Sequence, residues 1–243
     1  MASDARVRRA VVLFTGNPRV EERQKHLPAR FLSTLHRELR STIERMAGVD
    51  LVVASEDTAG FRVDCGATTS RLVDGVTGGL AARVELAFNA AFAAGYDSVV
   101  VLAGDILGLR RETLERSFER LEETDGSCVL GPSGDGGFYL AGLRSGTSFD
   151  WSSIPWRSSD VSIAFCASAV EAGLVVRIVE RLDDVDSLAD AVRLTDSLHP
   201  AFHELRRALR SLLSVRLHAI PARPRIERCN RDMARQLRAP PSA

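Results

Sequence analysis

The chain has 243 residues, of which 45% are hydrophobic, 26% charged and 6% aromatic, and 32 basic residues balance 32 acidic ones. This composition is typical of one large α/β domain or two small ones, and it excludes collagen, a coiled coil and wholesale disorder. No apolar run approaches the roughly 20 residues of a membrane-spanning helix, and the N-terminus lacks a signal-peptide core, so a cytoplasmic protein is expected. A net charge of zero gives no reason to expect DNA as a partner.

Two rare residue types, lysine and cysteine, are informative. Lys25 is the only lysine, so every other basic residue is an arginine. Codon usage accounts for the arginines, but it does not explain why the single lysine stands at position 25. The four cysteines (Cys65, Cys128, Cys166 and Cys229) are far apart and form no C-x-x-C pair, which predicts ordinary thiols rather than a zinc site or a disulfide framework.

Apolar, β-branched runs predict four buried parallel strands, and the amphipathic stretches between them predict four helices. The expected strands are Ala10–Thr15, Asp50–Ala54, Ser98–Ala103 and Leu174–Val179. The expected helices are Arg30–Met46, Gly78–Ala94, Glu112–Glu123 and Ser159–Gly173. Strand alternating with helix predicts a Rossmann-like, three-layer α/β/α fold with a mostly parallel sheet. Two further short strands, Ser127–Gly131 and Gly137–Gly142, are expected to form an antiparallel or mixed edge.

The C-terminal part of the chain differs in charge. After Asp186 the sequence is expected to be helical to about Leu217, followed by a proline-broken linker and a short charged helix. The simplest division is a catalytic-size domain over residues 1–199 and an Arg-rich helical extension over residues 200–243. Ten arginines and three acids give this extension a charge of about +7. Such a tail can bind anionic lipid, RNA or an acidic partner, or support a homodimer, but the lack of interleaved aromatic residues favours a solvated helix.

Ligands of open parallel sheets bind beyond the carboxyl ends of the strands, where two loops of this chain carry suitable groups. Thr15–Lys25 matches neither G-x-G-x-x-G nor a Walker A loop, yet its glycine, amide and cations suit a phosphate-bearing ligand. Ala103–Leu109 carries Asp105 directly after the most apolar strand. A carboxylate there is costly without a cation, so Asp105 is the best metal-ligand candidate, with a cap of the following turn as the alternative.

Two later loops carry further carboxylates. Gly131–Tyr139 places four glycines around Asp135, which lets backbone approach a ligand closely, although a plain hairpin turn also uses Asp-Gly. Leu182–Ser187 places three carboxylates before a helix. Its Asp186 either caps that helix, the commoner use of such a residue, or contacts a metal.

The loops, taken in order, resemble a family of GT-A-like bacterial transferases, the radical-SAM-associated or arsenosugar-type glycosyltransferases. Val99–Leu109 and Gly131–Leu143 are similar to the family's G-[TS]-D-x-P-x-L strand end and its G-P-x-x-D-G-G-[YF]-Y-L-x-G-L segment. Ile154–Val161 resembles I-x-W-S-T-x-x-V, Leu182–Ser187 resembles L-x-D-V-D-T, and Gly78–Arg83 is a weaker match to G-D-L-G-x-R. These matches span about residues 10–197, and the D-G-G-[YF]-Y-L segment is the most specific.

The resemblance implies a nucleotide-diphospho-sugar transferase fold, with Mg²⁺ or Mn²⁺ at Asp105 and, as in nucleotidyltransferases of that fold, at Asp186. Asp135 would be catalytic and would orient an acceptor hydroxyl or act as its base. Lys25 would neutralise the phosphates and Arg83 could contact them, unless Arg83 is an exposed surface residue. The nucleotide-binding residues implied are Thr15, Gly16, Lys25, Arg83 and Gly104.

The first loop departs from the family's N-P-x-x-G-x-x-K-T-R-L pattern. Glu21 replaces the glycine, and Gln24-Lys25-His26 replaces K-T-R. The function favoured is metal-dependent glycosyl transfer from a nucleoside-diphosphate sugar to a small acceptor. One alternative is nucleotidyl transfer from an NTP to a phosphorylated small molecule, against which Glu21 and Glu22 argue. The other is a catalytically degenerate nucleotide-binding or scaffold protein.

Overall fold

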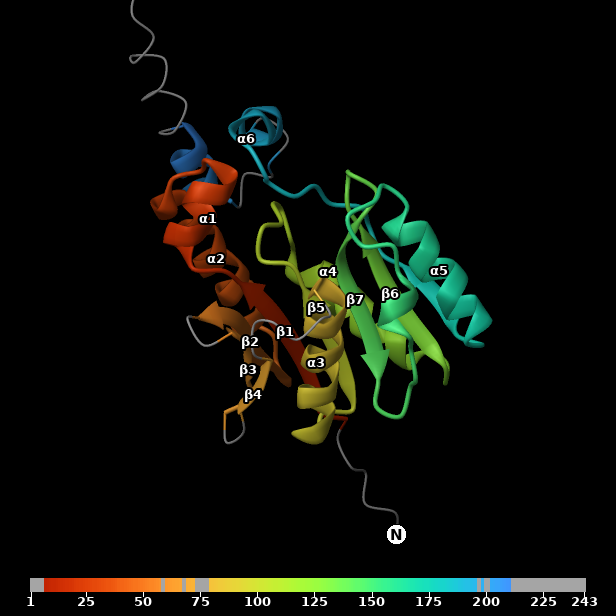
Figure 1. Cartoon of the computed structure of the whole chain (residues 1–243). Helices are drawn as coiled ribbons and strands as arrows, with labels where there is room; N and C mark the ends of the chain where they lie inside the picture. Colours follow the sequence, from red (N-terminus) through yellow and green to blue (C-terminus); the bar gives the residue numbers. More distant parts are fainter. Residues whose placement is uncertain are drawn as a thin grey trace, which may run out of the picture.

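The computed structural model describes residues 7–57, 60–66, 69–72, 79–195, 198 and 202–210 (Figure 1). Helices and strands alternate along most of this chain. In order they are β1 (Arg9–Thr15), α1 (Pro18–Lys25), α2 (Ala29–Glu44), β2 (Val49–Asp57), β3 (Gly60–Asp64), β4 (Thr69–Leu72), α3 (Gly79–Ala93), β5 (Ser98–Leu102), α4 (Arg111–Glu122), β6 (Ser127–Pro132), β7 (Phe138–Arg144), the 3₁₀ turn Trp151–Ser153, α5 (Val161–Glu171), β8 (Val175–Ile178) and α6 (Leu188–Thr195).

The eight described strands form one sheet in the order β4-β3-β2-β1-β5-β7-β6-β8. β1 pairs in parallel with both β2 and β5, and β6 pairs in parallel with β8. β3 and β7 run against their neighbours, so six of these strands point the same way. The sheet is therefore mostly parallel in direction, as the sequence predicted.

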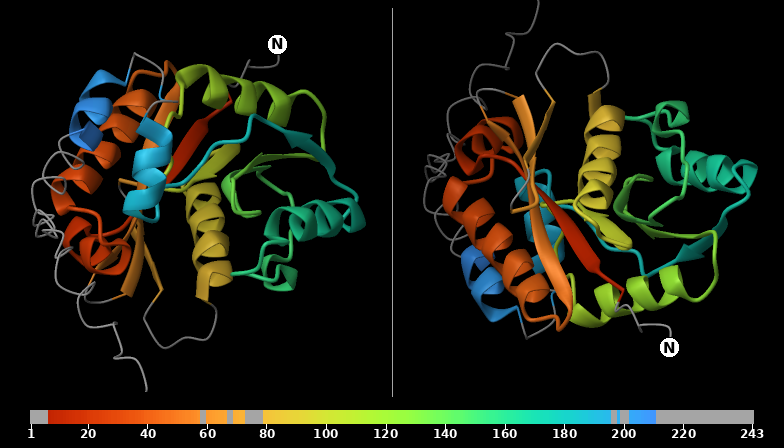
Figure 2. Two further views of the ribbon diagram at one scale, coloured as in Figure 1. Left: turned by 90° about the horizontal axis from the view of Figure 1, so that it is seen from above. Right: turned by 90° about the horizontal axis from the view of Figure 1, so that it is seen from below.

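The side chains of β1 alternate between two cores, one on each face of the sheet. Val11 and Leu13 belong to the core under α2, α4 and α6, whereas Ala10 and Val12 belong to the core under α3 and α5. All four side chains are fully buried. Figure 2 shows the same arrangement from the end of the sheet, with helices on both faces, which confirms the three-layer α/β/α architecture.

The predicted strands and helices are found with shifts of a few residues at their ends, but three elements were missed. α1 falls in a segment interpreted as a loop, because the helix has eight residues and buries none of them, so it shows no apolar period. Its local signals are Asn17, whose side chain accepts from the Arg19 N–H, followed by Pro18 at the first turn. β3 and β4 are short antiparallel strands added to the β2 edge.

The predicted edge hairpin is placed differently from the expectation. β6 and β7 are antiparallel, but β7 pairs with β5 in the interior and β8 forms the edge beside β6. The side chains of β7 enter the cores on both faces of the sheet, which explains why five consecutive residues of this interior strand are buried.

The predicted C-terminal extension begins with a packed helical segment. Residues 203–210 are helical, and Leu205 and Leu209 are buried in the same core as Leu35 of α2. Seven of its ten arginines, the linker and the last predicted helix lie outside the described residues, so the division at residue 199 stays a prediction. Cys65, Cys128 and Cys166 are free, whereas Cys229 lies outside the described part. Among the described helices, none is long and apolar enough to cross a lipid bilayer.

Candidate functional site

The carboxyl ends of β1 and β5 lie side by side because the two strands pair in parallel, with Leu13 opposite Leu102. Beyond them is a cavity of about 600 Å³. Its walls come from the loop after β1, from α1 and α3, from β2 and β3 and from the loop after β5. The lining residues are Phe14, Thr15, Gly16, Asn17, Val20, Glu21, Gln24, Ala54, Glu56, Phe61, Leu80, Arg83, Ala103, Gly104 and Asp105.

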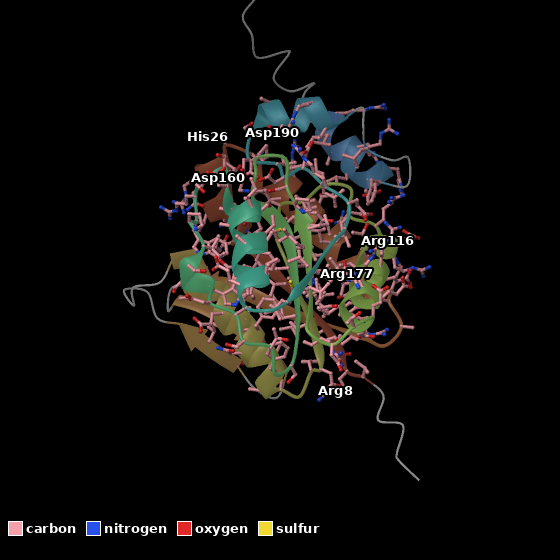
Figure 3. All side chains as sticks on the ribbon, turned by 90° about the vertical axis from the view of Figure 1, so that its right-hand side faces the viewer. Arg8, His26, Arg116, Asp160, Arg177 and Asp190 are labelled. Carbon is pink, nitrogen blue, oxygen red and sulfur yellow. The ribbon has the colours of Figure 1, made fainter. Side chains whose placement is uncertain are left out.

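Several elements end at this side of the molecule. Figure 3 labels His26 after α1, Asp160 before α5 and Asp190 in α6 near one end of the sheet, and Arg8 near the other. His26 has a left-handed backbone conformation (φ 54°), which ends α1 directly after Lys25. The C-terminus of α1 thus carries a lysine where the helix dipole favours a cation.

Lys25 joins the two aspartates that the sequence predicted as metal ligands. Its Nζ donates to Asp105 Oδ2 at 2.5 Å and to Asp186 Oδ1 at 2.6 Å. The Lys25 side chain is 17% exposed. Burial lowers the pKa of Lys25, but the two carboxylates outweigh burial and raise it above its ordinary value, so the ammonium stays charged.

The two aspartates meet because backbone hydrogen bonds join their loops. The Leu107 N–H donates to the Asp183 carbonyl at 3.2 Å, and the Val185 N–H donates to the Asp105 carbonyl at 3.0 Å. Between these bonds Ile106 forms an antiparallel bridge with Asp184. Ile106 and Val185 are buried, so apolar anchors hold both carboxylates at one place.

The alternative roles of Asp105 and Asp186 as caps do not describe their side chains. Ser187 caps α6, since its Oγ accepts from the Asp190 N–H at 3.2 Å and donates to Asp190 Oδ2 at 2.6 Å. The Asp186 side chain is 60% exposed and points to Lys25 instead. Asp105 likewise directs its carboxylate to Lys25.

The donor set suits a divalent cation that is shared with a ligand. Two carboxylate oxygens converge on one cationic centre, and Mg²⁺ commonly takes one or two carboxylates and completes its shell with phosphate and water. Within the described ranges, no group of three or more His, Cys, Asp or Glu side chains could hold a metal ion by itself. Mg²⁺ or Mn²⁺ at Asp105 and Asp186 stays a prediction.

Gly104 is required by a close approach between β1 and the loop after β5. A Cβ at this position would lie 2.1 Å from the Phe14 carbonyl oxygen. At Gly16 a Cβ would meet the Glu21 side chain, whose Oε1 accepts from the Gly16 N–H at 3.0 Å. Thus Thr15, Gly16 and Gly104 all line the cavity, but the Gly16 N–H already donates a hydrogen bond to the Glu21 carboxylate.

Arg83, predicted as a phosphate contact, lines the cavity from α3. Its guanidinium donates to Glu56 Oε1 at 2.8 Å and lies 5.5 Å from the centroid of the Phe61 ring. Arg83 is therefore held by a carboxylate and an aromatic face, partly exposed at the cavity wall.

Asp135 lies outside the contacts that Lys25 makes with Asp105 and Asp186, although it is near enough to Asp184 to raise the pKa of that residue. It lies in the turn between β6 and β7, where its Oδ1 accepts from Ser133 Oγ at 2.5 Å and from the Gly137 N–H at 2.9 Å. The Ser133 hydroxyl lowers the pKa of Asp135, burial opposes it, and the Gly137 N–H lowers it further. These bonds are those of the hairpin-turn alternative.

Sequence reasoning missed two titratable residues of the site. Burial, followed by repulsion from Asp186, Asp105 and Asp135, raises the pKa of Asp184 to about 6. Its only sequence signal was membership of the Asp183-Asp184-Val185-Asp186 run. His36 is buried on α2 with Nε2 3.5 Å from Glu21 Oε2, and burial lowers its pKa. A histidine on an apolar helix face gives no distinguishing signal.

A family model described as an uncharacterized protein conserved in bacteria (DUF2064) matches residues 34–158, just over half of the chain. This range includes Arg83, Gly104, Asp105 and Asp135 but neither Lys25 nor Asp186. No curated protein matches the sequence.

Among solved structures, a proposed nucleotide-diphospho-sugar transferase from Desulfovibrio desulfuricans G20 is similar with a TM-score of 0.71 and 20% identity, covering 87% of this chain and 98% of that one. A homologue of Mycobacterium tuberculosis Rv0371c from Mycobacterium sp. strain JC1 has a TM-score of 0.42 and 13% identity, and the match covers 84% of this chain and 98% of that one. The inositol-1-phosphate CTP transferase from T. maritima has a TM-score of 0.40 and 14% identity, and the match covers 84% of this chain and 96% of that one. The first likeness confirms the nucleotide-diphospho-sugar transferase fold; at this identity it establishes the fold alone.

Proposed function

The chain belongs to the DUF2064 family of proteins conserved in bacteria, and from this membership and the site geometry we propose that it is a nucleotide-using transferase. The reaction the site supports best is glycosyl transfer from a nucleoside-diphosphate sugar to a small acceptor. The observation that carries the proposal is the placement of Lys25. The single lysine of an arginine-rich chain reaches Asp105, which lines the cavity, and Asp186, whose loop is joined to that of Asp105 by backbone hydrogen bonds.

The cavity has an apolar part and a polar part that suit a nucleotide. Phe14, Phe61 and Leu80 can cover a base and a ribose, and the polar part ends at Asp105. Lys25, as a compact charge, would neutralise the phosphates, and Arg83 could contact them from α3. A cation there stabilises the departing nucleoside diphosphate as well as the bound donor, so Lys25 would act in both states.

Asp105 and Asp186 would hold the Mg²⁺ or Mn²⁺. When bound, the ion would supply Lewis-acid stabilisation of the leaving diphosphate. Asp135 would accept the hydrogen bond of an acceptor hydroxyl. Its lowered pKa suits orientation of that hydroxyl better than removal of its proton at neutral pH.

Glu21 bears on the nucleotidyltransferase alternative. A triphosphate needs several cations and free backbone N–H groups in the first loop. Here the carboxylate of Glu21 accepts the hydrogen bond of the Gly16 N–H at 3.0 Å, so this N–H is not available to a phosphate. This favours a diphosphate donor over an NTP.

A thermal-shift screen tests the proposal. Nucleotides and nucleotide sugars are compared with and without Mg²⁺ or Mn²⁺, because a ligand at a hundredfold excess over its Kd stabilises the folded state by about 2.7 kcal/mol. We expect UDP- or GDP-sugars to raise the melting temperature and Asp105→Ala to abolish the metal-dependent part. Asp125→Ala is the matched control, since it removes an exposed aspartate next to β6 at the opposite end of the sheet. If no nucleotide shifts the melt, the proposal is wrong; a response to NTPs alone favours nucleotidyl transfer.

A further inference from the structure

The charges around the cavity are already committed to partners within the protein. Lys25 binds Asp105 and Asp186, and Arg83 binds Glu56. Glu21 adds a further carboxylate on the wall, and burial lowers the pKa of His36, which favours its neutral form. A diphosphate that approaches this arrangement therefore meets more carboxylates than cations, and binding requires that some ion pair be exchanged.

The geometry identifies which pair can be exchanged. Asp105 and Asp186 are fixed by the backbone bonds between their loops, whereas Lys25 reaches them through a flexible side chain from the last residue of α1. An ammonium with two carboxylate oxygens at 2.5 and 2.6 Å lies where a divalent cation bound by the same oxygens would lie. Lys25 can leave without disturbing the fold of the aspartate loops.

We infer that Lys25 is a stand-in cation: it holds the metal position between Asp105 and Asp186 in the protein without ligand, and the metal and the nucleotide enter by exchange with it. Asp105 and Asp186 would then hold the divalent cation, and the released ammonium of Lys25 would contact the donor phosphates. The inference rests on the proposed function for the identity of the nucleotide, but the exchange between Lys25 and metal is independent of it.

Exchange has a measurable consequence for metal affinity. Because the carboxylates bind metal only while Lys25 is displaced, the apparent affinity for metal alone is reduced by the fraction of time the site is open. Lys25→Met removes the competitor and keeps the length of the side chain. It should therefore tighten the binding of Mn²⁺ alone, while weakening the binding of a nucleotide.

The experiment is Mn²⁺ binding to the full chain without nucleotide, followed by electron paramagnetic resonance of the free ion. We expect Lys25→Met to bind Mn²⁺ roughly tenfold or more tightly than the wild type, since a charge has been removed from between two carboxylates. Arg23→Met is the matched control, because it removes an exposed cation from the same turn of α1 and should leave the affinity within about twofold. The double variant Lys25→Met/Asp105→Asn should lose the increase in Mn²⁺ affinity, because it lacks one of the two carboxylates. Equal affinities of Lys25→Met and wild type, or an equal gain in Arg23→Met, overturn the inference.

A second measurement uses the wild-type protein and does not depend on whether the variant folds. Since Lys25 is the only lysine, an amine-directed reagent marks its ε-amino group uniquely in a peptide mass map. Labelling should be slow without metal, faster with Mg²⁺ alone and slow again with Mg²⁺ and a nucleotide that binds. A labelling rate unchanged by Mg²⁺ overturns the exchange. If Mg²⁺ accelerates labelling but no nucleotide binds, the exchange stands and the proposed function fails.

Discussion

The backbone N–H of Gly16 donates to Glu21 Oε1 at 3.0 Å, so a side chain of α1 occupies a donor at the carboxyl end of β1. The other oxygen of Glu21, Oε2, is buried without a hydrogen-bond partner and lies 3.5 Å from His36 Nε2. Burial raises the pKa of Glu21, Lys25 opposes the rise, and Asp105 adds to it. A charged carboxylate is therefore unfavourable at this position, and the protein keeps it next to the proposed phosphate site.

Glu21→Gln should stabilise the protein at neutral pH by about 0.5–1 kcal/mol, because the amide keeps the Gly16 bond and can donate to neutral His36. A raised pKa means that the folded state binds its proton more tightly, so the wild type loses stability as pH rises through the interval between the unfolded and folded pKa values. The Glu21→Gln variant lacks this dependence of stability on pH, because the amide does not titrate. Urea unfolding at pH 4 and pH 7 measures the difference, with exposed Glu22→Gln as the control. A less stable Glu21→Gln at pH 7 would contradict the interpretation of the buried oxygen.

Gly104→Ala and Gly16→Ala separate a backbone clash from a side-chain clash. At Gly104 the added Cβ would lie 2.1 Å from the Phe14 carbonyl oxygen, and neither strand end can move without disturbing the sheet. At Gly16 the three nearest atoms all belong to the Glu21 side chain, which can rotate away. We expect Gly104→Ala to cost about 2–3 kcal/mol of unfolding free energy and Gly16→Ala less than about 1 kcal/mol. Chemical denaturation compares the unfolding free energies of the two variants. Equal losses would show that the close approach of Gly104 to β1 does not exclude a side chain at position 104.

The sequence predicted where the helices and strands lie along the chain better than it predicted which residues are in contact in the fold. β1 and β5 were found because both faces are covered and the residues form continuous apolar runs. α1 was missed because its amphipathic period is absent, although its last residue, Lys25, was singled out. That Lys25 bonds both Asp105 and Asp186 could not be predicted, since the contact joins residues 80 and 161 positions apart through the pairing of two loops.

Asp135→Asn and Asp135→Ala test whether this residue serves more than its turn. Asn can accept the bonds from Ser133 and Gly137 with its Oδ1, so Asp135→Asn should change stability by less than about 0.5 kcal/mol. Asp135→Ala loses both bonds and should cost about 1 kcal/mol. Because Asp135 does not line the 600 Å³ cavity, a nucleotide that stabilises the wild type should stabilise both variants equally. A reduced thermal shift in Asp135→Asn would place Asp135 on the donor side instead of the acceptor side.

The Arg9–Glu122 pair predicts a pH dependence of stability away from the site. Arg9 Nε donates to Glu122 Oε1 at 2.8 Å and Arg9 Nη2 to Oε2 at 2.5 Å, a two-point contact between β1 and the end of α4. Burial raises the pKa of Glu122, but the hydrogen bonds and the charge of Arg9, together with smaller contributions from neighbouring groups that include the charge of Arg144, outweigh burial and lower the pKa below its ordinary value.

A lowered carboxyl pKa contributes stability that is complete above the pKa of an unfolded glutamate, roughly 4.3, and is lost as pH falls through the lower pKa of the folded state. Glu122→Gln should therefore cost about 1 kcal/mol at pH 7. The Arg9 side chain is 36% exposed, which keeps the cost below that of a buried pair. The difference from wild type should shrink towards zero near the acid end of the unfolding profile. Glu85→Gln, an exposed glutamate on α3, is the control and should follow the wild type at every pH. A deficit in Glu122→Gln that persists unchanged in acid would mean that packing, not charge, holds β1 to α4.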